Sequence, residues 1–285
     1  PLLFESSAAA GPWSRSDLPA RTDLKKAYAI KISLDPGESI YIANNLPRTL
    51  EQVLSEAEKI SEAGSWQRHV YGESAQGRDL VAYMKGYPNK KPVVLVTSGF
   101  HPPEPDTLAT LTIMKELNKE EFEYLTKNFA IVIIPVVNPD GYAMQTQGSN
   151  AAGVNLYWDF RINDPGRCPE SEALWHFCTL LEPCGYIDFH AYTFQLNKDA
   201  GPYQKPPSLY RRAVARDAAR EIYKNHAENV GGQPVTGFHT FAPTTLGARL
   251  TCRFDTVTLA KYHLHLNEGI NHCCMRSWKT FLILC

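Results

Sequence analysis

Two histidines and one glutamate occupy positions from which they can act on a single centre. His101 and Glu104 stand three residues apart just after the apolar run 92–97, and His190 ends the short predicted strand 186–190. In a tight turn, a His-x-x-Glu spacing lets an imidazole nitrogen and a carboxylate oxygen face the same point. Two imidazoles and one carboxylate, with a fourth position open to water, are typical of a catalytic Zn²⁺ site. The alternative for His101 and Glu104 alone is a surface histidine that happens to lie near a glutamate.

Buried strands are expected to present these side chains. Runs 92–97 and 129–137 are apolar and of strand length, residues 186–190 predict a shorter third strand, and residues 68–71 and 78–85 predict a hairpin. Helical spacing covers residues 49–63, 106–117, 170–181 and 209–230, and a late strand is predicted at 262–266. We therefore expect an α/β fold, with a mixed, mostly parallel sheet flanked by helices and ligands at the carboxyl ends of its strands. Residues 1–30 are expected to form an N-terminal arm, and residues 31–285 a single catalytic domain.

Composition narrows the function classes. The 285 residues carry 29 basic and 30 acidic side chains, for a formal charge of −1. With so even a balance, no field attracts a polyanion or an anionic membrane, so neither nucleic acid nor membrane is an expected partner. Seven cysteines, an odd number without a C-x-x-C pair, favour a reducing compartment such as the cytoplasm and give no support to a thiolate zinc site. Oligomeric state is not readable from the sequence.

Five motifs in a fixed order give the chain a resemblance to the M14 family of zinc carboxypeptidases. They are G-x-S-x-x-G-R at residues 72–78, His-x-x-Glu at 101–104, Asn-Pro-Asp-Gly-Tyr at 138–142, Gly-Val-Asn-Leu at 153–156 and the histidine at 190. The similarity runs from about residue 50 to about residue 268. It implies a zinc carboxypeptidase-like fold, a peptidase activity, and His101, Glu104 and His190 as the metal ligands.

Departures from the family pattern concern the substrate. Where the family places an Asn-Arg pair that grips the terminal carboxylate, this sequence has Tyr157 and Trp158, and residues 143–152 contain no basic side chain. Neither Tyr nor Trp can replace the two charge-assisted hydrogen bonds of an arginine fork. Arginines that could substitute from other loops, if they are not plain surface residues, are Arg161, Arg167, Arg249 and Arg253. The aromatic side chains expected to line a substrate wall, with core packing as the alternative, are Tyr142, Tyr157, Trp158 and Tyr192.

The resemblance also implies a general-base glutamate on a late strand. Glu268 is the only carboxylate near the matching stretch 262–269 and is the expected base, with Asn267 as the alternative occupant of the metal-facing position by strand parity. His263 and His265 are two residues apart and share one face of a strand, which suits a metal or a supporting role equally. We favour the supporting or packing role, because three ligands are already supplied elsewhere.

The resulting expectation is a zinc-dependent hydrolase that cleaves a peptide or amide bond. Without a carboxylate grip, its substrate is expected to be a modified or otherwise atypical peptide, or an acylated amino acid. An orthodox carboxypeptidase that releases C-terminal residues, and a catalytically inactive protein that binds peptides in the same pocket, remain the alternatives.

Overall fold

The computed structural model describes residues 4–8, 11–17, 20–21, 29–43, 48–102, 104, 106–146, 148–161, 166–190, 203–204, 210–229 and 244–261. The chain divides into two compact units, Pro1–Thr49 and Leu50–Cys285. Residues 31–49, which we had grouped with the catalytic domain, therefore fall in the N-terminal unit. In that unit β1 (Phe4–Ser6) pairs antiparallel with both β2 (Ser14–Arg15) and β5 (Tyr41–Ala43), and β3 (Ala20–Arg21) pairs with β4 (Ala29–Ile30).

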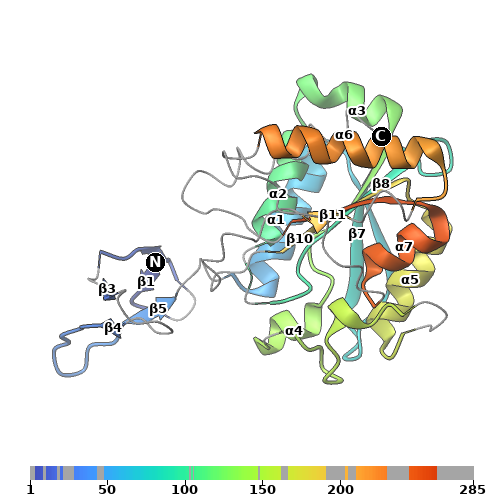
Figure 1. Ribbon diagram of the computed structural model, residues 1–285. Helices are drawn as coiled ribbons and strands as arrows, with labels where there is room; N and C mark the ends of the chain where they lie inside the picture. The colour runs from blue at the N-terminus through green and yellow to red at the C-terminus, as the bar shows by residue number, and fades with distance from the viewer. Residues whose placement is uncertain are drawn as a thin grey trace. The chain divides into compact units, whose positions relative to one another are not determined.

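A mixed sheet of seven described strands forms the centre of the larger unit, in the order β11-β12-β10-β8-β9-β7-β6 (Figure 1). The four parallel strands are β12 (Val257–Lys261), β10 (Gly185–Phe189), β8 (Val93–Thr97) and β9 (Ala130–Ile134). On one edge, β7 (Asp79–Lys85) and β6 (Gln67–Glu73) continue the sheet antiparallel. On the other edge, β11 (Tyr203–Gln204) pairs antiparallel with β12. The mixed sheet expected from the sequence is confirmed.

Helices cover both faces of the sheet and enclose two hydrophobic clusters (Figure 1). The first cluster packs apolar side chains of α1 (Leu50–Gly64), α2 (Thr107–Glu116), α3 (Glu123–Asn128) and α6 (Ala213–Asn229) on one face. The second packs α5 (Pro169–Leu181) and α7 (Leu246–Phe254) on the other. Strands β8, β9 and β10 are buried along their whole length because both faces are covered, which explains why their sequences are mainly apolar, with Thr97 and Asp188 as buried polar exceptions.

Most elements follow the sequence pattern, and those that do not are short or late. The predicted helices and strands correspond to α1, α2, α5, α6, β6, β7, β8, β9 and β10. Short helical segments that the pattern did not reveal are η1 (Glu120–Phe122), α3, α4 (Pro139–Met144) and η2 (Leu156–Trp158). Helix α7 and strand β12 were also missed, and the predicted strand 262–266 lies outside the described residues.

Within the described residues, neither cysteine pairing nor a membrane span constrains the fold. The described cysteines, Cys168, Cys178, Cys184 and Cys252, are all free thiols. Among the described helices, none has both the length and the apolar character that crossing a bilayer requires.

Gly99 fixes the path of the chain where it leaves β8. Its φ is +71°, and a Cβ here would lie 2.8 Å from both the Pro135 carbonyl oxygen and the Val136 Cα. The Gly99 N–H donates to Asp106 at 2.9 Å, and its carbonyl accepts from the Asn138 N–H at 3.0 Å. The loop after β8 is therefore held against the segment after β9 from its first residue.

Replacing Gly99 should therefore destabilise the fold more than its backbone angle alone predicts. Gly99→Ala adds a clash with backbone to the cost of about 1–2 kcal/mol for an L-residue in the left-handed region. We expect a loss of about 3 kcal/mol in the free energy of unfolding, measured by urea denaturation.

Gly77→Ala is the matched control for this substitution. Gly77 has a φ of +73°, but nothing lies within 4 Å of a Cβ built there. It should lose only about 1 kcal/mol. Equal losses in the two variants would contradict the role assigned to the close backbone contact at Gly99.

Candidate metal centre

His101, Glu104 and His190 come together as the sequence predicted. One ligand atom from each lies within 4.8 Å of the others. The Nδ1 atom of His101 is 3.0 Å from Glu104 Oε1, and the Nδ1 atom of His190 is 3.3 Å from Glu104 Oε2. His190 is fully buried, and His101 and Glu104 are each 9% exposed. The glutamate therefore sits between the two imidazoles, with one carboxylate oxygen toward each ring.

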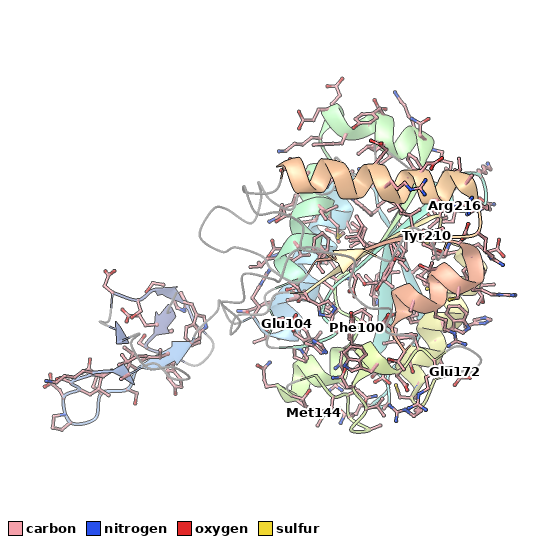
Figure 2. All side chains as sticks on the ribbon, in the orientation of Figure 1. Phe100, Glu104, Met144, Glu172, Tyr210 and Arg216 are labelled. Carbon is pink, nitrogen blue, oxygen red and sulfur yellow. The ribbon has the colours of Figure 1, made fainter. Side chains whose placement is uncertain are left out.

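Parallel pairing of β8 and β10 explains how residues 86 or more positions apart in sequence meet. The two strands are neighbours, with Thr97 opposite Asp188, so their carboxyl ends reach the same edge of the sheet. His190 directly follows β10, while His101 and Glu104 lie in the loop after β8. Within this loop the Glu104 N–H donates to the His101 carbonyl at 3.0 Å, which closes the turn that aims both side chains. Figure 2 labels Phe100 and Glu104 at the end of the sheet where α4 lies.

Electrostatics keep the glutamate ionised. Burial alone would raise the pKa of the Glu104 carboxyl, but hydrogen bonds from His101 and His190 outweigh it and lower the pKa to about 2. Burial would likewise lower the pKa of His190, yet the nearby charges and hydrogen bonds of Asp188 and Glu104 hold it well above its usual value. The carboxylates of Asp188 and Glu104 both favour a positive charge beside His190. A divalent cation would supply that charge in place of a proton.

Each histidine has a second contact on the far side of its ring. The Nε2 atom of His190 is 3.0 Å from Asp188 Oδ2, and the Nε2 atom of His101 is 3.4 Å from the amide oxygen of Asn155. Because these acceptors face Nε2, Nδ1 is the nitrogen of each ring that would bind a metal when the metal displaces the proton shared with Glu104. The donor set and its supporting contacts therefore fit Zn²⁺, which accepts imidazole nitrogen and carboxylate oxygen ligands.

Aromatic rings enclose the two histidines. The Tyr157 ring lies edge-to-face on His190, with centroids 4.7 Å apart, and also contacts His101 at 5.8 Å. Phe100 stacks against His190 at 5.9 Å and is fully buried. These contacts fix the ring planes and keep water away from the sides of His190 that carry no ligand atom.

The segment 138–142 supports the loop that carries His101 and Glu104. The Asn138 side chain accepts from the Gly141 N–H at 2.9 Å, which starts α4, and donates to the Phe100 carbonyl at 3.2 Å. The Tyr142 hydroxyl donates to the backbone carbonyl of Glu104 at 3.3 Å. The motif at 138–142 therefore binds the metal-site loop through its backbone.

Asp140 connects this segment to the turn of the β6–β7 hairpin. Its carboxylate is fully buried and accepts from the Ser74 hydroxyl at 2.7 Å, the Gln76 N–H at 2.9 Å and Arg78 Nη1 at 2.6 Å. The G-x-S-x-x-G-R and Asn-Pro-Asp-Gly-Tyr motifs thus form a single contact. Their shared role is to hold α4 against the hairpin.

The predicted aromatic residues fall at different depths. Tyr142 is 2% exposed and packs in the first hydrophobic cluster, so it supports the site from within the core. Tyr157 is 5% exposed and lies on the two histidines, whereas Trp158 is 44% exposed and lies edge-to-face on Tyr157 at 4.6 Å. Trp158 is therefore the one of these three rings that a substrate can cover.

The predicted arginines are mostly engaged elsewhere. Arg249 is 8% exposed, with its guanidinium 3.8 Å from the centroid of the Trp175 ring. Arg253 lies 5.8 Å over Phe254, and Arg167 pairs with the buried Asp159 at 2.7 Å. Arg161 is exposed, three residues beyond Trp158. Tyr192, His263, His265, Asn267 and Glu268 lie outside the described residues.

The sequence prediction mainly missed the residues that contact and orient His101 and His190. Asp188 precedes His190 by two residues and so shares its face of the strand, a signal that could have identified it. Asn155 was visible only as part of a motif. Gly148, with a φ of +121°, would place a Cβ 2.9 Å from the His101 ring, and nothing in its local sequence indicates that contact.

Comparison with known proteins identifies the type of fold. Residues 56–171 match the family model described as zinc carboxypeptidase. A metallo-carboxypeptidase from Burkholderia cenocepacia superposes with a TM-score of 0.78 at 17% identity, over 99% of this chain and 79% of that one. The metallo-carboxypeptidase from Pseudomonas aeruginosa in complex with (2-guanidinoethylmercapto)succinic acid gives 0.74 at 17% identity, over 99% and 78%. Thrombin activatable fibrinolysis inhibitor gives 0.61 at 15%, over 85% and 74%.

None of the curated proteins compared matches the sequence. The family model and the solved structures nevertheless agree with each other. The resemblance to the M14 zinc carboxypeptidases is therefore confirmed, and so is the carboxypeptidase-like fold.

Asp140 offers a test of how strongly the site is supported. Asp140→Asn places an amide N–H₂ where the carboxylate accepts three donors, which leaves a buried donor or the Arg78 charge uncompensated. We expect a loss of about 3 kcal/mol in the free energy of unfolding by urea denaturation.

Asp79→Asn is the matched control. Asp79 also pairs with an arginine, Arg68, at 2.8 Å, but the two side chains are 50% and 41% exposed. Its loss should stay within about 0.5 kcal/mol. A loss at Asp140 as small as that at Asp79 would show that this buried junction contributes little.

Proposed function

We propose that this zinc carboxypeptidase-like protein is a zinc-dependent hydrolase of peptide or amide bonds. The observation that supports the proposal best is the buried triad of His101, Glu104 and His190, whose donor atoms lie within 4.8 Å of one another. The proposed cofactor is Zn²⁺. When bound, Zn²⁺ lowers the pKa of a water molecule toward about 7 and polarises the carbonyl group of a substrate.

The described residues would hold the metal and shape its surroundings. His101 and His190 would bind the metal through Nδ1, because Asn155 and Asp188 engage the opposite ring nitrogens. Glu104 stays ionised because both imidazoles favour its charged form. Burial by Phe100 and Tyr157 lowers the local dielectric constant and so strengthens the interactions of the site with charge that develops in the reaction.

A general base is also needed, and we assign it to Glu268. The assignment rests on the resemblance, since this residue is the only carboxylate near the stretch 262–269. Glu268 would take a proton from the attacking water and return it to the leaving amine. Asn267 is the alternative occupant of that position, and an asparagine could not accept the proton.

We propose that the substrate is not recognised through a free terminal carboxylate. Tyr157 and Trp158 stand where the family places its Asn-Arg pair, and Tyr157 is packed on the histidines. The exposed Trp158 ring offers an apolar wall with no positive charge, and Tyr192 is proposed to belong to the same wall. A modified or side-chain-linked peptide, or an acylated amino acid, suits such a wall better than a bare carboxylate.

An orthodox carboxypeptidase is the second candidate, and Arg161 is the observation that favours it. This side chain is exposed and follows Trp158 closely. The Pseudomonas aeruginosa neighbour was solved with a succinic acid derivative, a ligand that carries carboxylates. Arg249 and Arg253 are weaker choices as carboxylate ligands because of their contacts with Trp175 and Phe254.

Zinc binding and catalysis should be separable by mutation. His190→Ala should lower zinc affinity by more than about 100-fold, because it removes a direct ligand. Glu268→Gln should leave the zinc content unchanged and lower kcat by about 10²–10⁴-fold, because it removes only the proton acceptor. Zinc is measured by metal analysis and chelator competition, and turnover on the substrate panel described below.

His176→Ala is the control for the histidine substitution, since His176 is exposed on α5 and should change neither quantity. Full zinc binding with equal turnover in the parent and in Glu268→Gln would overturn the assignment of Glu268. An absence of turnover in both would favour the inactive peptide-binding protein.

A panel of matched peptides tests the substrate class. Each peptide is offered with a free C-terminus, with an amidated C-terminus and as an N-acyl amino acid. We expect kcat/KM for the blocked or acylated forms to equal or exceed that for the free acid, because Tyr157 and Trp158 replace the Asn-Arg pair that would favour a carboxylate. Arg161→Ala should then leave the ranking unchanged.

Preference for free acids of about 100-fold or more, abolished by Arg161→Ala, would instead identify an orthodox carboxypeptidase. In that case the loss should appear in KM, since the arginine binds the ground state as well as the transition state.

A further inference from the structure

A line of buried hydrogen bonds runs from the core to His190. Tyr186, Asp188 and His190 alternate along β10 and its end, so they share one face of the sheet. Thr97 faces them from the neighbouring strand β8, opposite Asp188 in the pairing. The Thr97 hydroxyl is 2.8 Å from the Tyr186 hydroxyl and 3.2 Å from Asp188 Oδ1, and Asp188 Oδ2 is 3.0 Å from His190 Nε2. All four side chains are 4% exposed or less.

The carboxylate of Asp188 sets the direction of every hydrogen bond in this line. A carboxylate only accepts, so the Thr97 hydroxyl donates to Oδ1 and the His190 Nε2–H donates to Oδ2. The Thr97 oxygen is then free to accept from the Tyr186 hydroxyl. With the Nε2 atom of His190 engaged by Asp188, Nδ1 is the nitrogen that faces Glu104 and would bind the metal in place of a proton.

The two histidines of the triad are held unequally. His190 is held by a charged oxygen at 3.0 Å, and His101 by the neutral amide oxygen of Asn155 at 3.4 Å. The Asn155 oxygen also accepts from the Tyr157 N–H at 3.1 Å, so it is shared. A hydrogen bond to a charged group is roughly twice as strong as one between neutral groups. His190 is therefore the more firmly oriented of the two rings and the better electron donor.

We propose that Tyr186, Thr97 and Asp188 form a polarised hydrogen-bond chain that positions His190 as a metal ligand. The inference rests on the proposed zinc site. Asp188 makes the direct contact with the histidine, and Thr97 and Tyr186 act through Asp188. Without the Thr97 hydroxyl, Oδ1 of the buried carboxylate loses a donor, and the carboxylate can rotate away from the His190 ring. A purely structural role for Thr97 and Tyr186 would affect unfolding but would not affect the metal.

Zinc affinity of the full chain, measured by chelator competition, tests this chain of bonds. Asp188→Asn should lower the affinity about 10–100-fold, as outer-shell substitutions do. Thr97→Val should lower it by about 3–10-fold, and Tyr186→Phe by less. In the Thr97→Val background, Tyr186→Phe should cause no further loss, because the line is already cut. The visible absorption of the Co²⁺-loaded protein should change in the same order.

Another buried tyrosine and another buried threonine in the same unit, Tyr210 and Thr251, supply the controls. The Tyr210 hydroxyl accepts from the Thr258 N–H at 3.1 Å, and Thr251 donates to the Thr256 carbonyl at 3.0 Å. Both side chains are 1% exposed, and Figure 2 labels Tyr210 toward the opposite end of the sheet from Glu104. Tyr210→Phe and Thr251→Val should lower the melting temperature but change zinc affinity by less than about 2-fold.

Three outcomes decide the matter. The hydrogen-bond chain is supported if zinc affinity falls only in the Asp188, Thr97 and Tyr186 variants, and if the losses are not additive in the double variant. Zinc binding by the parent, with Thr97→Val and Tyr186→Phe equal to the controls or additive with each other, overturns it while leaving the proposed function intact. Failure of the parent itself to bind zinc overturns the proposed function and the chain together.

Discussion

A buried carboxylate between two imidazoles is the interaction on which the structure of the site depends. Glu104 is 9% exposed, and an ionised group so far from water is stable only where cations or hydrogen-bond donors surround it. His101 and His190 meet that demand from two different segments of the chain. They can do so only because β8 and β10 run parallel as neighbours. The order of the central strands is therefore part of the chemistry, and the same requirement for positive charge makes the position suitable for a divalent metal.

The sequence predicted the central sheet and the triad because both depend on local patterns. Strands buried on both faces must be apolar throughout, and the segments before Ser98 and Pro135 are. Parallel strands bring their carboxyl ends together, so residues that follow them are expected to meet. Short elements were missed because they are too short to show a periodicity, and two of them depend on a single capping contact. Helix α4 starts at the side chain of Asn138, and η2 at that of Asn155.

The surroundings of the triad could not be predicted in the same way, because they depend on contacts between distant segments. Tyr157 looked equivalent to Trp158 in sequence, yet one ring is packed on His190 and the other is open to solvent. Arg249 looked available to a substrate, and instead it lies on Trp175 of another helix. The periodicity of a sequence indicates which face of a helix or strand a side chain occupies. Which side chain it packs against depends on the tertiary structure.

The backbone contacts of the loop that carries His101 and Glu104 have a consequence for how the proposed metal would be bound. Asn138 and Tyr142 bind main-chain atoms of the loop, and Gly99 is pinned by Asp106 and Asn138. None of these bonds involves a ligand atom, so the loop keeps its course whether or not an ion is present. The proposed pocket would thus be formed before an ion arrives. Exchange of one metal for another would then need no refolding, and the donor atoms would govern the choice of ion.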